Sequence, residues 1–193
     1  MNWGEVKTAA LQKMFLSSSD PALFTSATKD YIGMMPAAAN EGLMRLAVAG
    51  RYIPKSADVT STSNLYDLKT LISDLFDPIT SGIMKQVDGV WVYLDGYDML
   101  PNYVLRVHDA GGYTIRVPYY AYPQTITTST TDNTNIAMDK DGCALLALYI
   151  ASELFKEDDI GLATQWRNEF EVALGAGRED RSPLARVIGG SDI

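Results

Sequence analysis

A single histidine and a single cysteine limit the chemistry that this chain of 193 residues can perform. A structural zinc site needs four His, Cys or carboxylate ligands at defined spacing, so one chain cannot build such a site around His108 and Cys143. A cysteine nucleophile needs a neighbouring base. Cys143 stands among small and apolar residues, which favours a packed thiol. We therefore expect neither a metal nor a cofactor.

Two short motifs imitate functional sites without their essential partners. Residues 26–29 (SATK) match the Ser-x-x-Lys spacing of penicillin-binding enzymes, but the companion Ser-Asp-Asn and Lys-Thr-Gly motifs are absent. Residues 139–142 (DKDG) resemble part of a calcium loop, yet its register places Ala137 and Leu148 at ligand positions. No glycine-rich phosphate loop occurs. The motifs therefore predict no catalytic residues.

One polar cluster keeps a catalytic alternative open. Asp95, Asp98, His108 and Asp109 stand near the expected ends of strands, where scattered residues can assemble into an active site. A small enzyme with a site near His108 is therefore an alternative hypothesis. It depends on this cluster alone.

The charge balance argues against a nucleic-acid-binding protein. The net charge is −8 and the isoelectric point is about 4.6, whereas affinity for nucleic acid comes mostly from neutralising phosphates with basic residues. Contact with passing DNA should be repulsive or fleeting. The one basic cluster is local and consists of Arg178, Arg181 and Arg186 near the C-terminus.

Nothing in the sequence predicts export or a membrane span. The longest apolar run, residues 143–151, has nine residues, whereas a spanning helix needs about 20. The first 18 residues contain no apolar run typical of a signal peptide. One cysteine cannot form an internal disulfide, which fits a reducing compartment. We expect synthesis in the cytoplasm and no membrane partner.

Helical spacing dominates both ends of the chain, residues 1–53 and 139–175. The N-terminal part predicts one helix before residue 16, then a second from a cap at Asp20-Pro21 to a stop at Gly50, with Pro36 kinking or splitting it. Near the C-terminus, Asp139 or Asp141 should cap a helix, and a further helix should end at Gly175 and Gly177.

The middle of the chain predicts strands. Residues 54–64 are rich in Ser, Thr and Asp and indicate a loop, and residues 65–76 are ambiguous between a short helix and a linker. A β-rich insertion follows at about 80–123, with a hairpin whose turn is Asp109-Ala110-Gly111-Gly112. Pro118 and Pro123 should prevent a central strand beyond Val117. Residues 124–135, rich in threonine, indicate a surface loop.

These elements predict an α+β fold with a mainly helical bundle body, an inserted β-hairpin or small β-sheet region, and a flexible C-terminal tail. Residues 1–175 would form one domain and residues 176–193 the tail. The segment 118–123 (PYYAYP) contains Tyr119, Tyr120 and Tyr122. Tyrosines are favoured at interfaces because they bury area and keep a polar group. These three could equally cover the core at a strand end.

The order of segments resembles that of the head-to-tail adaptor (connector) proteins of tailed bacteriophages. The likeness covers most of residues 1–175 and is poor over 54–88. The matching pieces are NEGLMRLA (40–47) in a long N-terminal helix, YDL (66–68), the Tyr-Pro segment 119–123, the helix ALLALYIASEL (144–154) and an amphipathic helix with Trp166 and Phe170.

The resemblance implies a structural virion protein of the phage neck. Its members form twelve-membered rings beneath the portal protein, and DNA passes through the ring without sequence-specific binding. The implied partners are the portal, tail or neck proteins and further copies of the chain. The C-terminal tail typically reaches the portal, so the predicted partner-binding residues are Arg178, Arg181, Leu184, Arg186, Val187 and Ile188. Tyr119, Tyr120 and Tyr122 are a candidate subunit or tail interface.

A further alternative is another phage ring protein, which composition does not distinguish from an adaptor. A tail-completion or tail-terminator ring protein would also be a small oligomeric virion protein. Binding to a tail tube in place of the portal would distinguish it.

Overall fold

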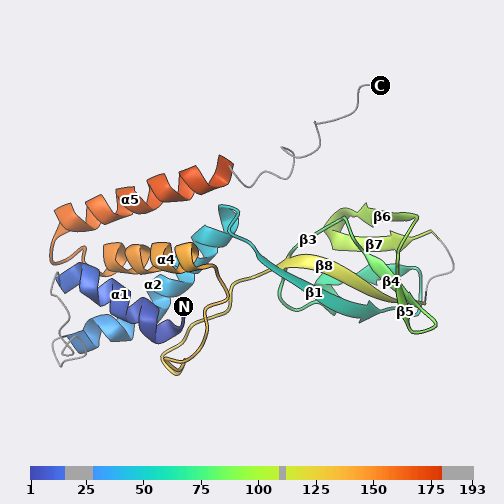
Figure 1. Cartoon of the computed structure of the whole chain (residues 1–193), viewed down its shortest axis with the longest axis horizontal. Helices are drawn as coiled ribbons and strands as arrows, with labels where there is room; N and C mark the ends of the chain where they lie inside the picture. Colours follow the sequence, from blue (N-terminus) through green and yellow to red (C-terminus); the bar gives the residue numbers. More distant parts are fainter. Residues whose placement is uncertain (16–27, 109–111, 180–193) are drawn as a thin grey trace. The chain divides into compact units, whose positions relative to one another are not determined.

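The computed structural model describes residues 1–15, 28–108 and 112–179 of the chain (Figure 1). The chain divides into two compact units. The helical unit comprises Met1–Arg51 and Pro123–Ile193, and the β unit comprises Tyr52–Tyr122. The β unit is therefore inserted between two helical segments. Each unit has a hydrophobic core of its own, and the two cores share no residue.

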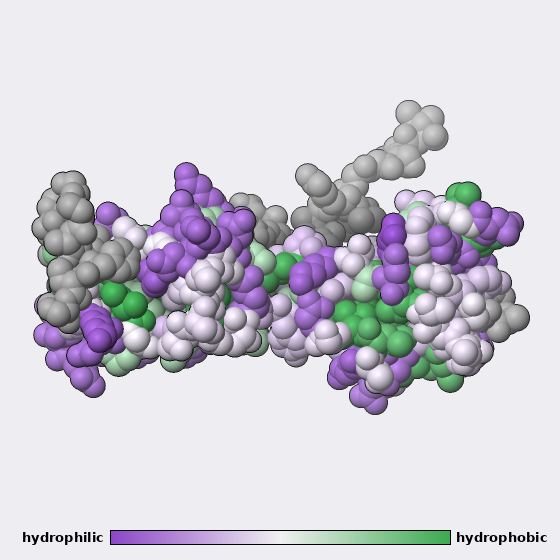
Figure 2. All heavy atoms as spheres, turned by 90° about the horizontal axis from the view of Figure 1, so that it is seen from below, coloured by the Kyte–Doolittle hydropathy of each residue, from purple (hydrophilic) through white to green (hydrophobic). Residues whose placement is uncertain are grey.

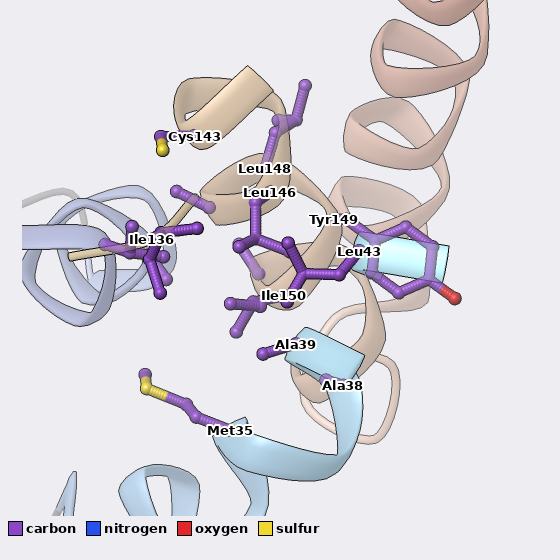
Figure 3. Close-up of a cluster of buried hydrophobic side chains, with 14 of the residues drawn as sticks. Met35, Ala38, Ala39, Leu43, Ile136, Cys143, Leu146, Leu148, Tyr149 and Ile150 are labelled. Atoms are coloured by element: carbon purple, nitrogen blue, oxygen red, sulfur yellow. The ribbon is translucent and has the colours of Figure 1, made fainter. Parts of the chain in front are cut away.

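The helical unit is built around one central helix. Helix α4 (Lys140–Leu154) contacts the three other long helices of the described chain, α1 (Trp3–Phe15), α2 (Lys29–Val48) and α5 (Ile160–Glu179). A helix that is apolar on nearly all sides is stable only when it is buried, and α4 has that composition. Figure 3 shows Leu146 and Ile150 of α4 pointing into the core and Tyr149 lying beside Leu43 of α2.

Two of the predicted helix boundaries are confirmed. The Asp139 carboxylate accepts a hydrogen bond from the Gly142 N–H at 2.6 Å and caps α4. Gly50 adopts φ 95° directly after α2, and the amides of Gly50 and Arg51 donate to the carbonyls of Ala47 and Leu46. This Schellman arrangement needs a residue that tolerates the left-handed region, which glycine does without strain.

Other helix predictions need correction or fall outside the described residues. Helix α2 continues across Pro36 and is not split. The predicted end of the last helix at Gly175 and Gly177 is wrong, because α5 runs to Glu179. Glycine inside a helix costs only about 1 kcal/mol relative to alanine, which does not end a helix by itself. The predicted cap at Asp20-Pro21 lies outside the residues that the structure describes.

The threonine-rich segment 124–135 is a loop, as predicted, and it is anchored to two helices. The Trp3 and Gly4 amides at the start of α1 donate to the carbonyls of Thr134 and Asp132. Asn40 of α2 exchanges two hydrogen bonds with the backbone of Ile126, at 2.8 and 2.7 Å. The loop thereby satisfies amides that a helix N-terminus leaves without intrahelical partners.

Two antiparallel sheets form the β unit. The larger has the order β1-β8-β4-β5, with β3 also paired to β8, and the smaller has the order β2-β7-β6. A short helix, α3 (Leu68–Leu71), and a 3₁₀ turn, η3 (Pro101–Tyr103), connect strands. The strands are β1 (Ile53–Thr60), β2 (Leu65–Asp67), β3 (Leu75–Pro78), β4 (Met84–Val87), β5 (Val90–Tyr93), β6 (Tyr97–Leu100), β7 (Val104–Val107) and β8 (Thr114–Ala121).

The expected loop at 54–64 is wrong over most of its length. Residues 53–60 form β1, which pairs with β8 from Ile53↔Ala121 to Thr60↔Thr114. Only Ile53 and Val59 of β1 are buried, so the strand shows little hydrophobic alternation in its sequence. The apolar side chains of the alternating strand β8 fill the core beneath it. A strand of this kind is defined by its partner and not by its own composition.

The expected hairpin between residues 103–107 and 113–117 is also wrong. Both runs are strands, but β7 belongs to the smaller sheet and β8 to the larger one. Strand β7 pairs with β2 and β6, and β8 pairs with β1, β3 and β4. Alternation identifies a strand without identifying its partner. The turn residues Asp109, Ala110 and Gly111 lie outside the described part of the chain.

Pro118 does not end β8, contrary to the prediction that no central strand continues past Val117. On one edge of β8, the partner changes from β4, at Ile115 and Arg116, to β3, at Tyr119. The Pro118 carbonyl accepts from the Ile79 amide at this change-over. The missing N–H of Pro118 faces the same edge, between the two partner strands, so no ladder bond is lost.

The predicted fold class is therefore wrong in one respect. The fold is α+β, but its body is not mainly a helical bundle, because two antiparallel sheets form a second compact unit. The strand content was underestimated because β1, β2 and β3 lie in 53–78, where the sequence has no clear period of two.

Candidate interaction surfaces

The polar cluster proposed as a catalytic site is partly assembled. The Nε2 atom of His108 lies 3.0 Å from the Asp98 carboxylate, to which Arg106 is also hydrogen-bonded. The Arg106 hydrogen bond lowers the pKa of Asp98. Asp95 is exposed, and Asp109 is outside the described residues. The three side chains form an exposed polar cluster on β6, β7 and the residue after β7, with the Arg106–Asp98 ion pair joining the two strands.

Cys143 is a packed thiol, as predicted. Its side chain is fully buried at the start of α4, and burial raises its pKa. A protonated thiol is a poor nucleophile and a poor metal ligand. Among the residues with described side chains, no cluster of three or more His, Cys, Asp or Glu could hold a metal ion.

The predicted portal-binding residues lie at the edge of the structure. Arg178 belongs to the last turn of α5, and its side chain is not described. Arg181, Leu184, Arg186, Val187 and Ile188 fall in 180–193, outside the described residues, as does Ser26 of the SATK motif. Their role therefore remains a prediction from the sequence.

The tyrosines of the Tyr-Pro segment differ in exposure. Tyr119 is buried in the core of the β unit, and its hydroxyl donates to Asp74 at 2.8 Å. Burial, followed by this hydrogen bond, raises the pKa of Tyr119 to about 12. Tyr120 is half-buried, whereas Tyr122 is 46% exposed. These neighbouring positions therefore present aromatic groups both to the core and to solvent.

Tyr120 and Tyr122 belong to a larger group that we call the aromatic cluster, formed with Tyr52 and Phe76. The Tyr52 and Tyr120 rings stack with their centroids 4.2 Å apart, and Phe76 meets Tyr122 edge-on at 5.1 Å. Tyr52 and Phe76 are also neighbours, at 6.2 Å. Tyr52 and Tyr122 are both more than 40% exposed. Stacked aromatic rings that stay accessible are typical of interface anchors.

The hairpin of β4 and β5 exposes a second apolar surface. Its tight turn, Asp88-Gly89, has both residues at positive φ, as type I′ turns require. We call the exposed side chains of Val87, Val90, Val92 and Tyr93 the hairpin patch. On the face of the β unit drawn in Figure 2, hydrophobic residues also reach the surface. The strand register places Val87, Val90 and Val92 on one face of the sheet, which is also the face of the buried Ile115.

Strand β5 is also an unprotected sheet edge. Within the described chain it pairs only with β4, and Val90 to Tyr93 contain neither a charge nor a proline. Each other edge strand carries a carboxylate: Asp58 in β1, Asp67 in β2, Asp77 in β3 and Asp98 in β6. Proteins normally protect edges with charge or proline, because bare edges pair with other chains. Strand β5 lacks this protection.

The helical unit has an apolar groove of about 370 Å³ beside the C-terminal half of α2. It is lined by Glu41, Met44, Arg45, Val48, Ala49 and Leu174. Met44 and Val48 are 41% and 62% exposed.

None of the described helices is long and apolar enough to cross a membrane.

Comparison with protein families assigns nearly the whole chain to one family. The model of one family, described as SU10 adaptor protein, matches residues 1–187. The chain belongs to this family. No curated protein matches the sequence significantly. SU10 adaptor proteins are structural proteins of bacteriophage virions, so the resemblance to phage head-to-tail adaptors is confirmed.

In this SU10 adaptor, the sequence revealed only part of the surfaces. The Tyr-Pro segment pointed to Tyr120 and Tyr122, but not to their neighbours Tyr52 and Phe76, which lie far away in the sequence. The hairpin patch had a detectable signal, since the run of uncharged residues in β5 follows an Asp-Gly turn between two strands. The groove had none, because it depends on how α2 and Leu174 of α5 come together.

Proposed function

We propose that this SU10 adaptor assembles into a ring that joins the phage portal to the tail and forms part of the DNA channel. The family assignment supports the adaptor role. The observation that carries the ring assembly is the apolar surface of the β unit. The hairpin patch is exposed, and so are Tyr52 and Tyr122 of the aromatic cluster, although the β unit has a buried core of its own. Apolar surface of this kind marks interaction sites.

A closed ring of identical subunits needs heterologous contacts, in which two different surfaces of one chain meet. The β unit provides two separate surfaces of this kind, the hairpin patch and the aromatic cluster. We propose that they contact neighbouring subunits or the next tail component.

The C-terminal tail is the proposed portal-binding segment. It contains three basic and three large apolar side chains within 11 residues, beginning with Arg178 and ending with Ile188. Segments of this composition gain order on a partner surface. A chain with net charge −8 lining a channel would repel DNA phosphates, which lets DNA slide without lasting contacts.

Portal binding by the full chain and by a variant ending at Glu179 tests the proposal. That variant retains every described helix and strand. Light scattering of each protein alone and mixed with the portal should show a complex for the full chain only, with an unchanged circular dichroism spectrum for the variant. Equal portal binding by both chains would contradict the role of the tail. Binding of the full chain to the tail tube and not to the portal would favour a tail-completion or tail-terminator ring.

A further inference from the structure

The apolar groove of the helical unit lies along one side of α2 and is lined by exposed apolar side chains. Met44 and Val48 stand on the last two turns of α2, Ala49 follows the helix as its C-cap, and Leu174 of α5 completes the apolar lining. The Val48 side chain is 62% exposed, more than that of Met44. Such a run of apolar side chains at spacings of four and one is a helix face that normally packs against a further element.

Charged groups of both signs border this groove. The Arg45 guanidinium lies 3.2 Å from the Glu41 carboxylate and 3.6 Å from that of Glu171. The Arg45–Glu171 pair links α2 to α5 beside the apolar lining. An occupant with apolar groups at its centre and charged groups of both signs around them would complement the groove.

The C-terminal segment 180–193 has that composition. Leu184, Val187 and Ile188 are spaced i, i+3 and i+4, which places them on one face of a helix. Ser182-Pro183 before them is a helix-start signal, and Gly189-Gly190 after them is a stop signal. Arg181, Arg186 and Asp192 provide charges of both signs.

The segment also starts at the right place. Leu174, which lines the groove, precedes the end of α5 by five residues, or about 7.5 Å at the helical rise. Four residues, 180–183, separate α5 from Leu184, and they span up to about 13 Å when extended. The chain can therefore reverse direction after α5 and bring Leu184 back to the level of the groove.

We propose that residues 180–193 dock into the α2–α5 groove of their own chain, with Leu184, Val187 and Ile188 covering Met44, Val48 and Leu174. The consequence rests on the proposed function: the groove would compete with the portal for the same tail. A free subunit would keep its portal-binding residues covered, and the portal would release them. This competition would limit premature assembly.

A disulfide test asks whether the segment occupies the groove of its own chain. The variant Val48→Cys/Val187→Cys places one thiol in the groove and one in the segment. The matched control, Val172→Cys/Val187→Cys, uses an exposed valine of α5 that does not line the groove. Cys143 is buried and its pKa is raised, so it should not exchange. Mild oxidation at low protein concentration should give an intramolecular disulfide at least tenfold faster in the first variant.

Three results have distinct meanings. Faster monomeric cross-linking of the groove pair supports the proposal. Cross-linking at equal rates in both pairs, or disulfide-linked dimers only, overturns it, the latter because a second copy then fills the groove. A methyl NMR spectrum checks the native chain: truncation after Glu179 should shift the Met44 signal and leave that of Met34 unchanged, and an unchanged Met44 signal would also overturn it. No portal is present in either experiment, so docking can fail while the tail still binds the portal.

Discussion

Helices α2 and α4 pack closely at a glycine, Gly42. A methyl group at Gly42 would lie 2.8 Å from Cδ1 of Tyr149 and 2.9 Å from Cδ1 of Leu146, both in the core of the helical unit. Both distances are shorter than van der Waals contact, so these buried side chains or the two helices would have to shift. Gly33, on the same helix, has no atom within 4 Å of the same position.

We predict opposite effects of alanine at these two glycines. Gly42→Ala should lower the free energy of unfolding by about 1–3 kcal/mol, the usual cost of overpacking a core. Gly33→Ala should raise it by about 0.5–1 kcal/mol, because alanine favours the helix. Urea unfolding followed by circular dichroism at 222 nm measures both. A stabilising Gly42→Ala would refute the proposed close packing of α2 and α4.

Two carboxylates should make the β unit sensitive to acid. The hydrogen bonds from Arg116 lower the pKa of Asp58, and the hydrogen bond from Lys55 lowers that of Asp74. A lowered folded-state pKa means that the stabilisation is complete above the ordinary aspartate value, 3.8, and is lost as the pH falls through the folded value. The β unit should therefore lose stability below about pH 4.

Asp58→Asn tests this acid sensitivity. The variant should have a shallower loss of unfolding free energy between about pH 4 and pH 2 than the wild type. Asp88→Asn, in the turn of β4 and β5, is the control, because no ion pair involves Asp88 in the described structure. Parallel pH profiles for wild type and Asp58→Asn would show that the Arg116 pair contributes nothing.

At the scale of elements, the bare edge of β5 is the feature most directly linked to assembly. We predict that Val92→Lys blocks ring assembly while preserving the fold, because a lysine on an edge strand discourages pairing with another chain. Val172→Lys alters an equally apolar but unrelated exposed valine on α5 and should assemble normally. Sedimentation of each variant with the portal measures assembly. Normal rings of Val92→Lys would exclude the hairpin patch as a subunit contact.

The elements also show how far the sequence predicted the fold. The helices were predictable because a period of 3.6 is a local property, and the caps at Asp139 and Gly50 depend on residues within one turn. The partners of β7 and β8 were not, since they depend on residues up to 68 positions away. β1 escaped prediction because its core is supplied by β8. Only two members of the aromatic cluster, Tyr120 and Tyr122, were predicted from the sequence. Tyr52 and Phe76 meet them only after the sheet forms.

At the scale of the whole molecule, the two units have separate cores. The chain enters and leaves the β unit through paired strands, with Ile53 opposite Ala121. The ends of the fragment 52–122 therefore lie side by side within one sheet. We predict that this fragment folds alone, with cooperative thermal unfolding followed by the fluorescence of Trp91, which lies against the Arg116 guanidinium.

The complementary deletion provides the control. Joining residues 51 and 123 through a short Gly-Ser linker should leave a cooperatively folded helical protein. A 71-residue fragment is close to the size at which a single core becomes marginal, so a lower stability than in the full chain is expected. A fragment that stays unfolded, together with a helical unit that also fails to fold, would show that the two units depend on each other.

Ring formation on the portal is the proposed function of this SU10 adaptor. Electron microscopy of the purified chain mixed with its portal tests it most directly. We predict a closed ring of the chain stacked on the portal around an open channel. A chain that remains monomeric beside intact portal particles would contradict this function.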